Sequence, residues 1–393
     1  MNSYPMEPCF LNSMAMMSAL GSHPDDIKQR LLHGNPVLDL SQDYHSGPPL
    51  PIGRIQETLP EIPLDDAKYQ SRNNQLAWAV AQKIMPDIKA AINQYGKHRI
   101  GVIIGTSTSG ISDSEVYLRE HAESGEMPAG FDYRMQEMGA TARFLAVALG
   151  TCGPTFSIST ACSSGAKALA SARRLIRSGI CDAVIAGGVD TLCQLTVQGF
   201  ASLEAVSEQQ CNPFSENRNG INIGEAGALF LVSKEKSAIE LAGVGESSDA
   251  HHISAPDPSG AGAIRCMLAC LKDANIDSQA INYLNLHGTA TQLNDQMESK
   301  AVSEVFGANT PCSSTKPFTG HTLGAAGALE AAICWLSLTE SFIPKHLWDG
   351  CQDPNLPNIG LSEGAQHSSI SYALSNSFAF GGNNISLILR KTS

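Results

Sequence analysis

Apolar and polar residues follow two periods in turn, one typical of strands and one typical of helices. A period of two, or a short unbroken apolar run, predicts buried strands at residues 100–104, 154–160, 183–186, 226–232, 281–286, 311–314, 369–374 and 385–389. Apolar residues spaced three and four apart predict helices at about residues 25–32, 74–84, 86–95, 166–178, 261–274, 294–306 and 322–338. Strands that alternate with helices are typical of an α/β fold with mainly parallel sheets.

The same order of strands and helices begins again near residue 240. We therefore predict two similar halves, residues 1–240 and residues 241–393. Residues 36–65 are rich in proline and glycine and are expected to form an irregular surface segment. Residues 111–150 are expected to be mostly helical and to cover a pocket.

Cys162 lies where a predicted strand turns into a helix. The strand at residues 154–160 alternates Phe156 and Ile158 with small polar residues, and the helix that follows ends at Gly179. The unpaired amides and the positive dipole end of a helix N-terminus favour a thiolate, and the small residues of TACSSG leave the sulfur accessible. Cys162 is therefore a candidate nucleophile, although most of the 11 cysteines are expected to be buried apolar side chains.

Two histidines downstream lie in segments that suit a catalytic site. His287 ends a predicted strand and opens the polar segment HGTATQLND, and the C-terminal ends of strands carry the sites of α/β sheets. His321 follows Lys316 and precedes a helix that carries Glu330 and whose first turns are nearly all small residues, which permit a close approach to another backbone. Near the end of the chain, NSFAFGGNN is a glycine-hinged loop suited to presenting a backbone amide.

Each of these residues also has an ordinary structural interpretation. A single histidine more often packs than reacts, and Lys316 alone would be a solvated charge. Glu330 suits a helix cap or an ion pair, Phe378 and Phe380 suit a core, and GGN suits a turn. What favours chemistry is the order of one cysteine and two histidines with these neighbours.

Composition restricts the classes of function. The 393 residues carry a formal charge of −12, which disfavours general binding to nucleic acid or to an anionic membrane. No uncharged apolar run is long enough to span a membrane, and no basic residue precedes Lys28, so neither a membrane span nor a signal peptide is expected. The cysteines include no CxxC pair, which argues against a zinc ribbon and fits a reducing cytoplasm.

These motifs, in this order, resemble the β-ketoacyl-ACP synthases of the thiolase superfamily, the condensing enzymes of fatty-acid and type II polyketide synthesis. The resemblance covers about residue 95 to the end and is carried by TACSSG, HGTATQLND, STKPFTGH, GAAGALE, NSFAFGGNN, PFSENRNGINIGEAG and SDAHHISAPDPSG. It implies a thiolase-like fold of two duplicated βαβαβαββ-type halves in α-β-α-β-α layers, and a dimer. It leaves open whether the pathway makes fatty acids, a polyene or aryl-polyene, or another polyketide.

The resemblance implies a role for each candidate residue. Cys162 would take an acyl chain from acyl carrier protein as a thioester, and malonyl-carrier would then lose CO₂. His287 and His321, as neutral hydrogen-bond donors, would stabilise the enolate that attacks the thioester and lengthens the chain by two carbons. Lys316, held by Glu330, would tune the field around His321.

The segment near the C-terminus also receives a role from the resemblance. The backbone amides of Cys162 and Phe380 would form the oxyanion hole, and Phe380, with Phe378 beside it, would be a gate between acyl and malonyl entry. Neither an organic cofactor nor a catalytic metal is implied, because the malonyl carboxylate supplies its own leaving group.

The chain departs from the family pattern in several places. The family's opening strand is not recognisable at the N-terminus, which predicts a trimmed first half. Ala226, Ala290 and Ala379 stand where glycine, or at one of the positions serine, is common. A Cβ at residue 379 is expected to restrict positive φ and stiffen the gate, whereas the small Ala161 is expected to leave room for chains longer than acetyl.

The implied partners are an acyl- or malonyl-loaded carrier protein and a second synthase chain, identical or homologous and length-setting. Because the carrier and this chain are both acidic, docking requires a local basic patch. Lys68 and Arg72 resemble the family's docking region, and Arg134 is a further candidate. Each of the three also suits an ordinary solvated charge.

Three other functions are weighed against the synthase. A non-catalytic, length-setting subunit usually lacks the nucleophile, whereas this chain keeps Cys162. A thiolase acts on coenzyme A thioesters with a second cysteine as base, and the HGT and GH histidines fit the synthase better. A pure interaction protein would have no reason to assemble all three motifs.

Overall fold

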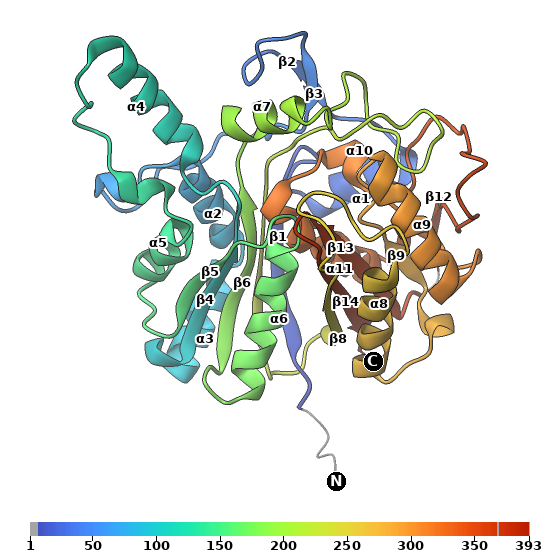
Figure 1. Cartoon of the computed structure of the whole chain (residues 1–393). Helices are drawn as coiled ribbons and strands as arrows, with labels where there is room; N and C mark the ends of the chain where they lie inside the picture. The colour runs from blue at the N-terminus through green and yellow to red at the C-terminus, as the bar shows by residue number, and fades with distance from the viewer. Residues whose placement is uncertain (1–6, 368, 393) are drawn as a thin grey trace.

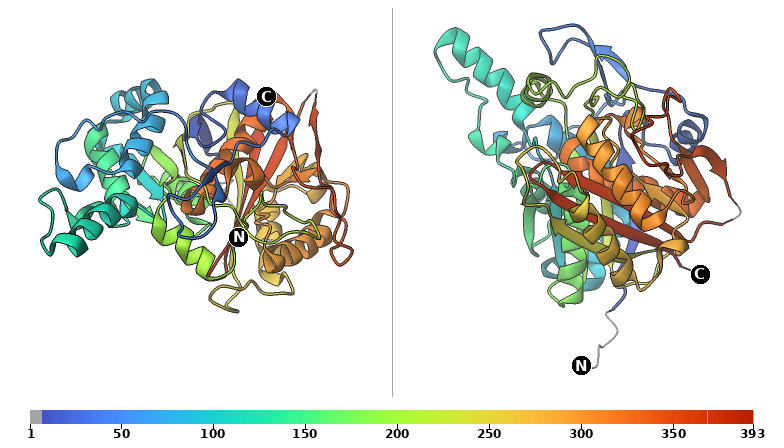
Figure 2. Two further views of the ribbon diagram at one scale, coloured as in Figure 1. Left: turned by 90° about the horizontal axis from the view of Figure 1, so that it is seen from above. Right: turned by 45° about the vertical axis from the view of Figure 1, so that its right-hand side comes forward.

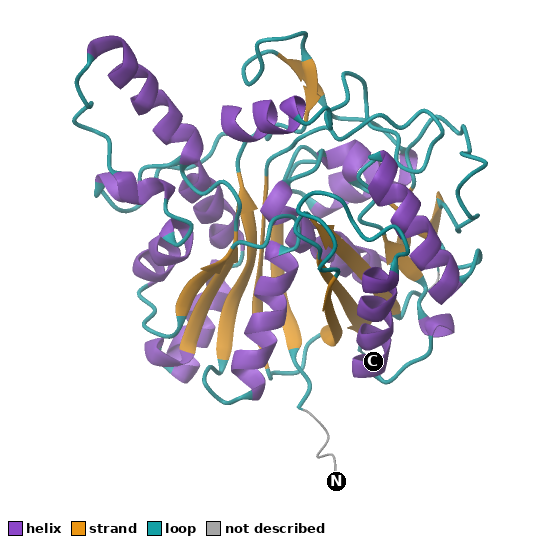
Figure 3. Cartoon of the chain, in the orientation of Figure 1, coloured by secondary structure: helices purple, strands orange, loops and turns teal. Residues whose placement is uncertain are grey.

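The computed structural model of the chain describes residues 7–367 and 369–392. Its strands fall into two groups, with helices between the groups and outside them (Figures 1 and 3). The strands are β1 (Phe10–Met17), β2 (Asp39–Ser41), β3 (Leu50–Ile52), β4 (Ile100–Gly105), β5 (Thr155–Ile158), β6 (Ala183–Asp190), β7 (Ala226–Ser233), β8 (Ile239–Ser248), β9 (Tyr283–Asn285), β10 (Cys312–Ser313), β11 (Phe342–Lys345), β12 (Glu363–Gln366), β13 (Tyr372–Ala379) and β14 (Asn383–Lys391). The helices are α1 (Pro24–His33), α2 (Arg72–Lys83), α3 (Met85–Tyr95), α4 (Ile111–Ser124), α5 (Ala140–Leu149), α6 (Ser164–Arg177), α7 (Gln194–Ser202), α8 (Ala261–Ala274), α9 (Gln292–Phe306), α10 (Lys316–Thr319) and α11 (Ala326–Glu340).

The main sheet has ten strands in the order β10-β9-β13-β14-β8-β1-β7-β6-β4-β5. Both ends of this order have three strands in parallel, β10-β9-β13 and β5-β4-β6, and then two that pair antiparallel. The two sets of five meet where β1 pairs with β8 through Phe10 and Glu240. The predicted α/β class is confirmed, and the strand order of the first five strands recurs in the second five.

Helices α6 and α11 lie between the two sets of strands and contact both, and they form the central core. Their backbones approach closely: a Cβ built on Gly165 would lie 2.8 Å from the Ala328 Cβ, and one built on Gly327 would lie 2.8 Å from the Ala166 Cβ. The close approach that the small residues around GAAGALE predict is therefore confirmed. It matters because α6 begins just after Cys162 and α11 begins just after His321.

Two outer layers complete the architecture. Helices α2 and α5 cover the strands of the first set, and α8 and α9 enclose a third core with the strands of the second set. From one outer face to the other, the order of layers is α-β-α-β-α, which the two views of Figure 2 help to follow. The boundary predicted at residue 240 stays a prediction, because a single sheet runs through both halves and residues 1–6, 368 and 393 lie outside the described part.

The prediction of a trimmed first half is wrong. Residues 10–17 form β1, which pairs along its length with β7 and joins the two sets of strands. The sequence of β1, FLNSMAMM, contains three methionines and no β-branched residue, so its propensity for strand is weak. Burial between neighbouring strands makes it a strand despite that propensity.

Residues 111–150 are mostly helical, as predicted, but they do not cover the cavity described below. Helix α4 extends away from the body of the molecule, at the upper left of Figure 1. No residue from 111–150 lines the cavity beside Cys162. Residues 36–65 form the short hairpin β2–β3 and otherwise irregular surface, in keeping with their proline and glycine content.

Candidate active site

Cys162 lies in the turn between β5 and α6 and is 5% exposed. The residue before it, Ala161, has a φ of 51°, a left-handed conformation that a residue with a Cβ rarely adopts. Two hydrogen bonds hold this turn: the Thr160 amide donates to Ser164 Oγ at 2.9 Å, and Ser164 Oγ donates to the Ala161 carbonyl at 2.6 Å. The strained turn therefore fixes the Cys162 side chain at the start of the helix.

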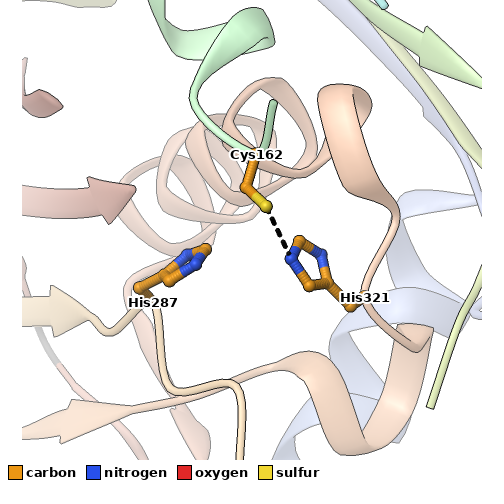
Figure 4. Close-up of side chains that lie close together, drawn as sticks. All are labelled: Cys162, His287 and His321. Atoms are coloured by element: carbon orange, nitrogen blue, oxygen red, sulfur yellow. Dashed lines mark hydrogen bonds between the residues drawn. The ribbon is translucent and has the colours of Figure 1, made fainter. Parts of the chain in front are cut away.

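His321 directs its ring at the sulfur (Figure 4). Its Nε2 lies 3.0 Å from Cys162 Sγ, and its Nδ1 accepts a hydrogen bond from the Leu323 amide at 3.2 Å. Because Nδ1 is an acceptor, the ring proton belongs on Nε2, which then donates to the sulfur. The ring of His321 is 3% exposed.

His287 reaches the same place from the end of β9 (Figure 4). Its ring centre is 5.5 Å from that of His321. The sulfur of Cys162 and one ring nitrogen from each histidine all lie within 4.8 Å of one another. Lys316 Nζ lies 3.4 Å from His287 Nδ1, bonds the His287 carbonyl and pairs with Glu330 Oε1 at 2.5 Å. An ammonium group beside Nδ1 makes that nitrogen the acceptor and leaves the proton on Nε2, which faces the site.

Burial sets the protonation of the site. It lowers the pKa of both His287 and His321 well below the ordinary value, and the charge of Lys316 lowers the pKa of each further. Burial also raises the pKa of Cys162 to about 11, although Lys316 opposes the shift. Near neutral pH the site therefore holds two neutral imidazoles and a thiol, not the thiolate that the helix end alone favours.

The Cys162 sulfur faces two backbone amides. The N–H groups of Phe380 and of Cys162 itself point toward Sγ and lower its pKa against the effect of burial. Phe378 is buried with its ring centre 6.3 Å from that of His287, whereas Phe380 is 39% exposed and lies against Phe200, with ring centres 5.7 Å apart. Two amides that converge on one point form the kind of pocket that stabilises a negative oxygen.

A cavity of about 490 Å³ opens beside these groups. Its apolar wall includes Phe200, Leu203, Phe378 and Phe380. Its polar lining includes residues of the HGTAT and RNG segments, together with others such as Asp249 and Asn384. The volume suits a slender, mostly apolar substrate arm with a few hydrogen-bonding groups. Cys162 lies at this cavity together with both histidines.

One cysteine and two histidines this close together also resemble a zinc ligand set. The electrostatics do not favour a cation at this point. Lys316 carries its ammonium group 3.4 Å from His287 Nδ1, and the carboxylate of Glu330 pairs with that ammonium and not with the site itself. The Nε2 atoms of both rings also carry protons by the hydrogen bonds described above.

The three predicted docking residues each pair with an acid. Lys68 pairs with Asp66, and Arg134 pairs with Asp132, and both pairs lie on the surface. Arg72 donates to Glu225, whose side chain is buried. The docking role stays a prediction, and Arg72 has a structural role besides.

The three departures from the family pattern differ in their surroundings. Ala226 begins β7 and is fully buried. Ala379 ends β13 and is absent from the residues with positive φ, so the predicted stiffening of the gate through φ at residue 379 is wrong. Positive φ in that loop belongs to Gly381 and Gly382, whereas Ala290 itself has a φ of 63°.

Sequence reasoning missed two buried carboxylates that organise the site. Glu298 accepts hydrogen bonds from the amides of His287 and Gly288, both at 2.7 Å, and burial raises its pKa to about 7. Asp190 accepts from the backbone after β4 and from the Gly324 amide at 2.6 Å, and so joins the two halves behind His321. The sequence held a usable signal for Glu298, because an acidic residue lies on the predicted helix eleven residues after His287. Asp190 gave no comparable signal, because it stands near no other motif and only follows an apolar strand and its two glycines.

Comparison with known proteins places these observations in a family. Residues 12–238 match the N-terminal domain of beta-ketoacyl synthase, and residues 238–348 match its C-terminal domain. The chain is 33% identical over 344 residues to "3-oxoacyl-[acyl-carrier-protein] synthase 2" of Staphylococcus aureus, and the match covers 83% of each chain. Among the described residues, no helix has both the length and the apolar character that crossing a membrane requires.

Solved structures agree with the sequence matches. A ketosynthase (ApeO) in complex with its chain length factor (ApeC) from Xenorhabdus doucetiae contains a chain that is 44% identical, with a TM-score of 0.93 and full coverage of both chains. The ishigamide ketosynthase/chain length factor is 25% identical with a TM-score of 0.87, and the match covers 99% of this chain and 100% of the other. The likeness over the whole length supports the thiolase-like arrangement of the layers.

Proposed function

The chain belongs to the β-ketoacyl synthase family and is a condensing acyltransferase, and from this premise we propose that Cys162 carries the acyl chain while His287 and His321 activate the malonyl unit. The reaction joins the acyl chain to malonyl-carrier with loss of CO₂ and lengthens it by two carbons. One observation supports the proposal above the others. A sulfur and two Nε2–H donors converge from three distant segments on one cavity.

In the first step the Cys162 sulfur attacks the carbonyl carbon of an acyl thioester on the carrier protein. A bond forms between Sγ and the acyl carbon, the bond from that carbon to the carrier sulfur breaks, and the thiol proton ends on the departing carrier sulfur. The amides of Cys162 and Phe380 face Sγ and would hold the negative oxygen of the tetrahedral intermediate.

In the second step malonyl-carrier loses CO₂, and the electron pair of the broken C–C bond passes into an enolate. The enolate oxygen would accept hydrogen bonds from the Nε2–H groups of His287 and His321. The enolate carbon then attacks the acyl carbon on Cys162. The Cys162 sulfur leaves with the electron pair and regains a proton from solvent, and the product is a β-ketoacyl-carrier.

The burial of the site supports this assignment of protons. A histidine that is neutral at working pH donates through Nε2 without taking up a proton, and burial keeps both rings neutral. Lys316 and the Leu323 amide hold the two Nδ1 atoms as acceptors. Both Nε2 protons are therefore available to a developing enolate.

Intact-mass measurement after incubation with an acyl-loaded carrier protein tests the proposal. We expect one acyl adduct on Cys162 and none on the Cys162→Ala variant. Because Cys152 and Cys351 are the exposed cysteines among the described residues, both proteins should carry serine at these positions. Addition of malonyl-carrier should then release CO₂ and return a product two carbons longer.

The other functions correspond to other outcomes of the same experiment. No adduct from any acyl donor would support a non-catalytic, length-setting subunit, and an adduct from acyl-coenzyme A alone would support a thiolase. An adduct that persists in Cys162→Ala would place the acyl group on another residue.

We also propose that the working assembly contains a second, homologous synthase chain together with the carrier protein. The support is the likeness to structures described as a ketosynthase with its chain length factor. Product analysis of the chain alone and after mixing with a homologous length-setting chain would separate the two cases. If this chain extended the acyl group by itself, as a monomer or as a dimer of identical copies, the proposed heterodimer would be wrong.

Lys68 is a docking candidate that can be tested without disturbing a buried pair, because its ion pair with Asp66 lies on the surface. Lys68→Glu should raise the KM for the carrier protein roughly 3- to 10-fold at low salt, with little change in kcat, because rim charges mainly affect association. Arg72 is not suitable, since its reversal would also leave the buried Glu225 without its partner. A KM unaffected by Lys68→Glu would remove this residue from the docking surface.

A further inference from the structure

The loop between β13 and β14, residues 380–382, carries Phe380 to the cavity, and we call it the Phe380 loop. Gly381 has a φ of 82° and Gly382 a φ of 72°, a conformation that glycine adopts without strain. Neither residue has a side chain that could anchor the loop. The Gly382 amide donates to the Ala379 carbonyl at 3.0 Å, and Ala379 pairs with Asn383, so the base of the loop is closed. Any further restraint on the Phe380 amide comes from neighbouring segments.

Backbone hydrogen bonds tie the Phe380 loop to the segment after β8. The Gly381 amide donates to the Ile253 carbonyl at 2.8 Å, and the Asp249 amide donates to the Gly382 carbonyl at 2.9 Å. Ile253 is 80% exposed and lies in a surface loop. These bonds join two loops to each other, and they do not fix the Phe380 loop relative to the nucleophile.

Lys167 connects the end of this loop to the nucleophile helix. It lies in the first turn of α6, five residues after Cys162, and its Nζ donates to Asn383 Oδ1 at 3.0 Å. Asn383 is the first residue of β14 and directly follows Gly382. The hydrogen bond therefore spans from the helix that carries the sulfur to the end of the loop that carries the opposing amide.

The surroundings of Lys167 make this contact a strong one. Its side chain is half-buried, and burial lowers the pKa of the ammonium, as does the nearby Arg174. Among the described residues, no ion pair involves Lys167. Its hydrogen bond to Asn383 joins a charged donor, the ammonium group, to a neutral acceptor, the amide oxygen. Lys167 is not among the residues that line the cavity, so it does not meet the substrate there.

We infer that Lys167 is a positioning residue, whose hydrogen bond to Asn383 holds the Phe380 loop so that the Phe380 amide meets the Cys162 sulfur. This inference rests on the proposed function, because the position of the amide matters only if Cys162 carries the acyl group. Without the bond, the two glycines let the loop move and the amide is at the thioester oxygen for less of the time. The rate of condensation then falls, whereas the binding of malonyl-carrier changes little.

Four variants separate this role from general stability. Lys167→Met removes the donor and keeps an apolar stem, Asn383→Ala removes the acceptor, and Lys167→Arg keeps a charged donor. Lys89→Met, at an exposed position on α3, is the matched control. The double variant Lys167→Met with Asn383→Ala tests whether the two residues act through one contact.

Hydrogen–deuterium exchange of a peptide covering residues 379–385 reports the loop without any substrate. We expect exchange roughly 10-fold faster in Lys167→Met and Asn383→Ala, which is the lower end of what a hydrogen bond to a charged group contributes. For the same two variants kcat should fall roughly 5-fold while KM for malonyl-carrier stays within about 2-fold. Lys167→Arg should restore both values, and the double variant should be no worse than either single variant.

The inference is wrong if Lys167→Met exchanges at the wild-type rate, if Lys89→Met gives the same change, or if the two single effects add in full. If the wild-type chain forms no acyl adduct on Cys162, the proposed function fails. The exchange rates would still report whether Lys167 holds the loop, so the two failures are distinguishable.

Discussion

At the scale of single residues, the site depends on buried groups that hydrogen bonds hold in place. His346 is one example: its Nδ1 accepts from the Ser314 amide at 3.1 Å, and its Nε2 donates to the Pro213 carbonyl at 3.0 Å. Ser314 Oγ in turn donates to the Gly288 carbonyl at 2.7 Å, beside His287. The ring of His346 therefore supports the backbone around a catalytic candidate while staying neutral itself.

Because burial lowers the pKa of His346 from 6.5 to about 4, its stabilising contribution depends on pH. Between these values the unfolded chain binds a proton that the folded chain does not, so the contribution is complete above pH 6.5 and is lost as the pH falls toward 4. We expect the gap in unfolding free energy between the wild type and His346→Gln to narrow by about 2 kcal/mol from pH 7.5 to pH 5. Denaturant unfolding at the two pH values measures the gap, and a gap of the same size at both would contradict this contribution of His346.

Lys316 is expected to affect decarboxylation more than acyl transfer, because it contacts His287 and not Cys162. Lys316→Met, made together with Glu330→Gln so that no buried carboxylate loses its partner, frees Nδ1 of His287 to take the proton, and the ring then presents an acceptor to the enolate. We expect CO₂ release to fall roughly 10- to 100-fold, with a smaller fall in the rate at which the Cys162 adduct forms. The surface variant Lys345→Met, which loses only the pair with Glu363, should leave both rates unchanged. If CO₂ release and adduct formation slowed equally, Lys316 would support the whole site and not His287 in particular.

At the scale of elements, the contact between α6 and α11 sets the distance between sulfur and imidazole. Both helices begin next to a site residue, and both present glycine or alanine where they cross. The crossing leaves no room for a larger side chain, because a Cβ on Gly327 would already lie 2.8 Å from the Ala166 Cβ. Packing of small residues thus acts on the geometry of the site.

Gly327→Val is expected to push α11 away from α6. Overpacking of this kind costs about 1–3 kcal/mol of stability, and here it should also lengthen the contact between His321 Nε2 and Cys162 Sγ. We expect a lower melting temperature together with slower acyl transfer to Cys162. Gly199→Ala is the control, because a Cβ at residue 199 of helix α7 meets nothing within 4 Å. If Gly327→Val were destabilised but Cys162 were acylated at the wild-type rate, the packing of α6 against α11 would matter for stability and not for the geometry of the site.

The elements that sequence patterns predict best are those with a strong period. The helix at residues 261–274 has the predicted bounds, and Cys162 lies in the predicted turn. Strands β1 and β8 were not predicted: the first is rich in methionine, and the second, IELAGVGESS, contains glycines that leave room for α8. The meeting of Cys162 with two distant histidines followed from the resemblance, since no local pattern specifies which strand ends become neighbours.

At the scale of the whole molecule, strand β5 is an open edge. It lies at the end of the ten-strand order, and it carries Phe156, which is 39% exposed. An edge strand with an apolar side chain is a natural place for a second chain to pair. The resemblance to the synthases implies a dimer, and β5 is the edge where we expect it to form.

Phe156→Glu should weaken such a dimer, because it places a charge on the edge strand. Sedimentation velocity should show a shift toward the monomer, and Leu268→Glu, at an exposed position on α8, should not cause it. A dimer that survives Phe156→Glu with unchanged affinity would place the interface elsewhere.

Cys162 follows β5 and precedes α6, and His321 follows β10 and precedes α11, so the two residues occupy corresponding places in the repeated order of strands. The two places offer the same kind of helix start to two different side chains. One carries a sulfur and the other an imidazole, and Cys162 Sγ and His321 Nε2 lie 3.0 Å apart. A repeated order of strands therefore holds a site in which each half contributes a different chemical group.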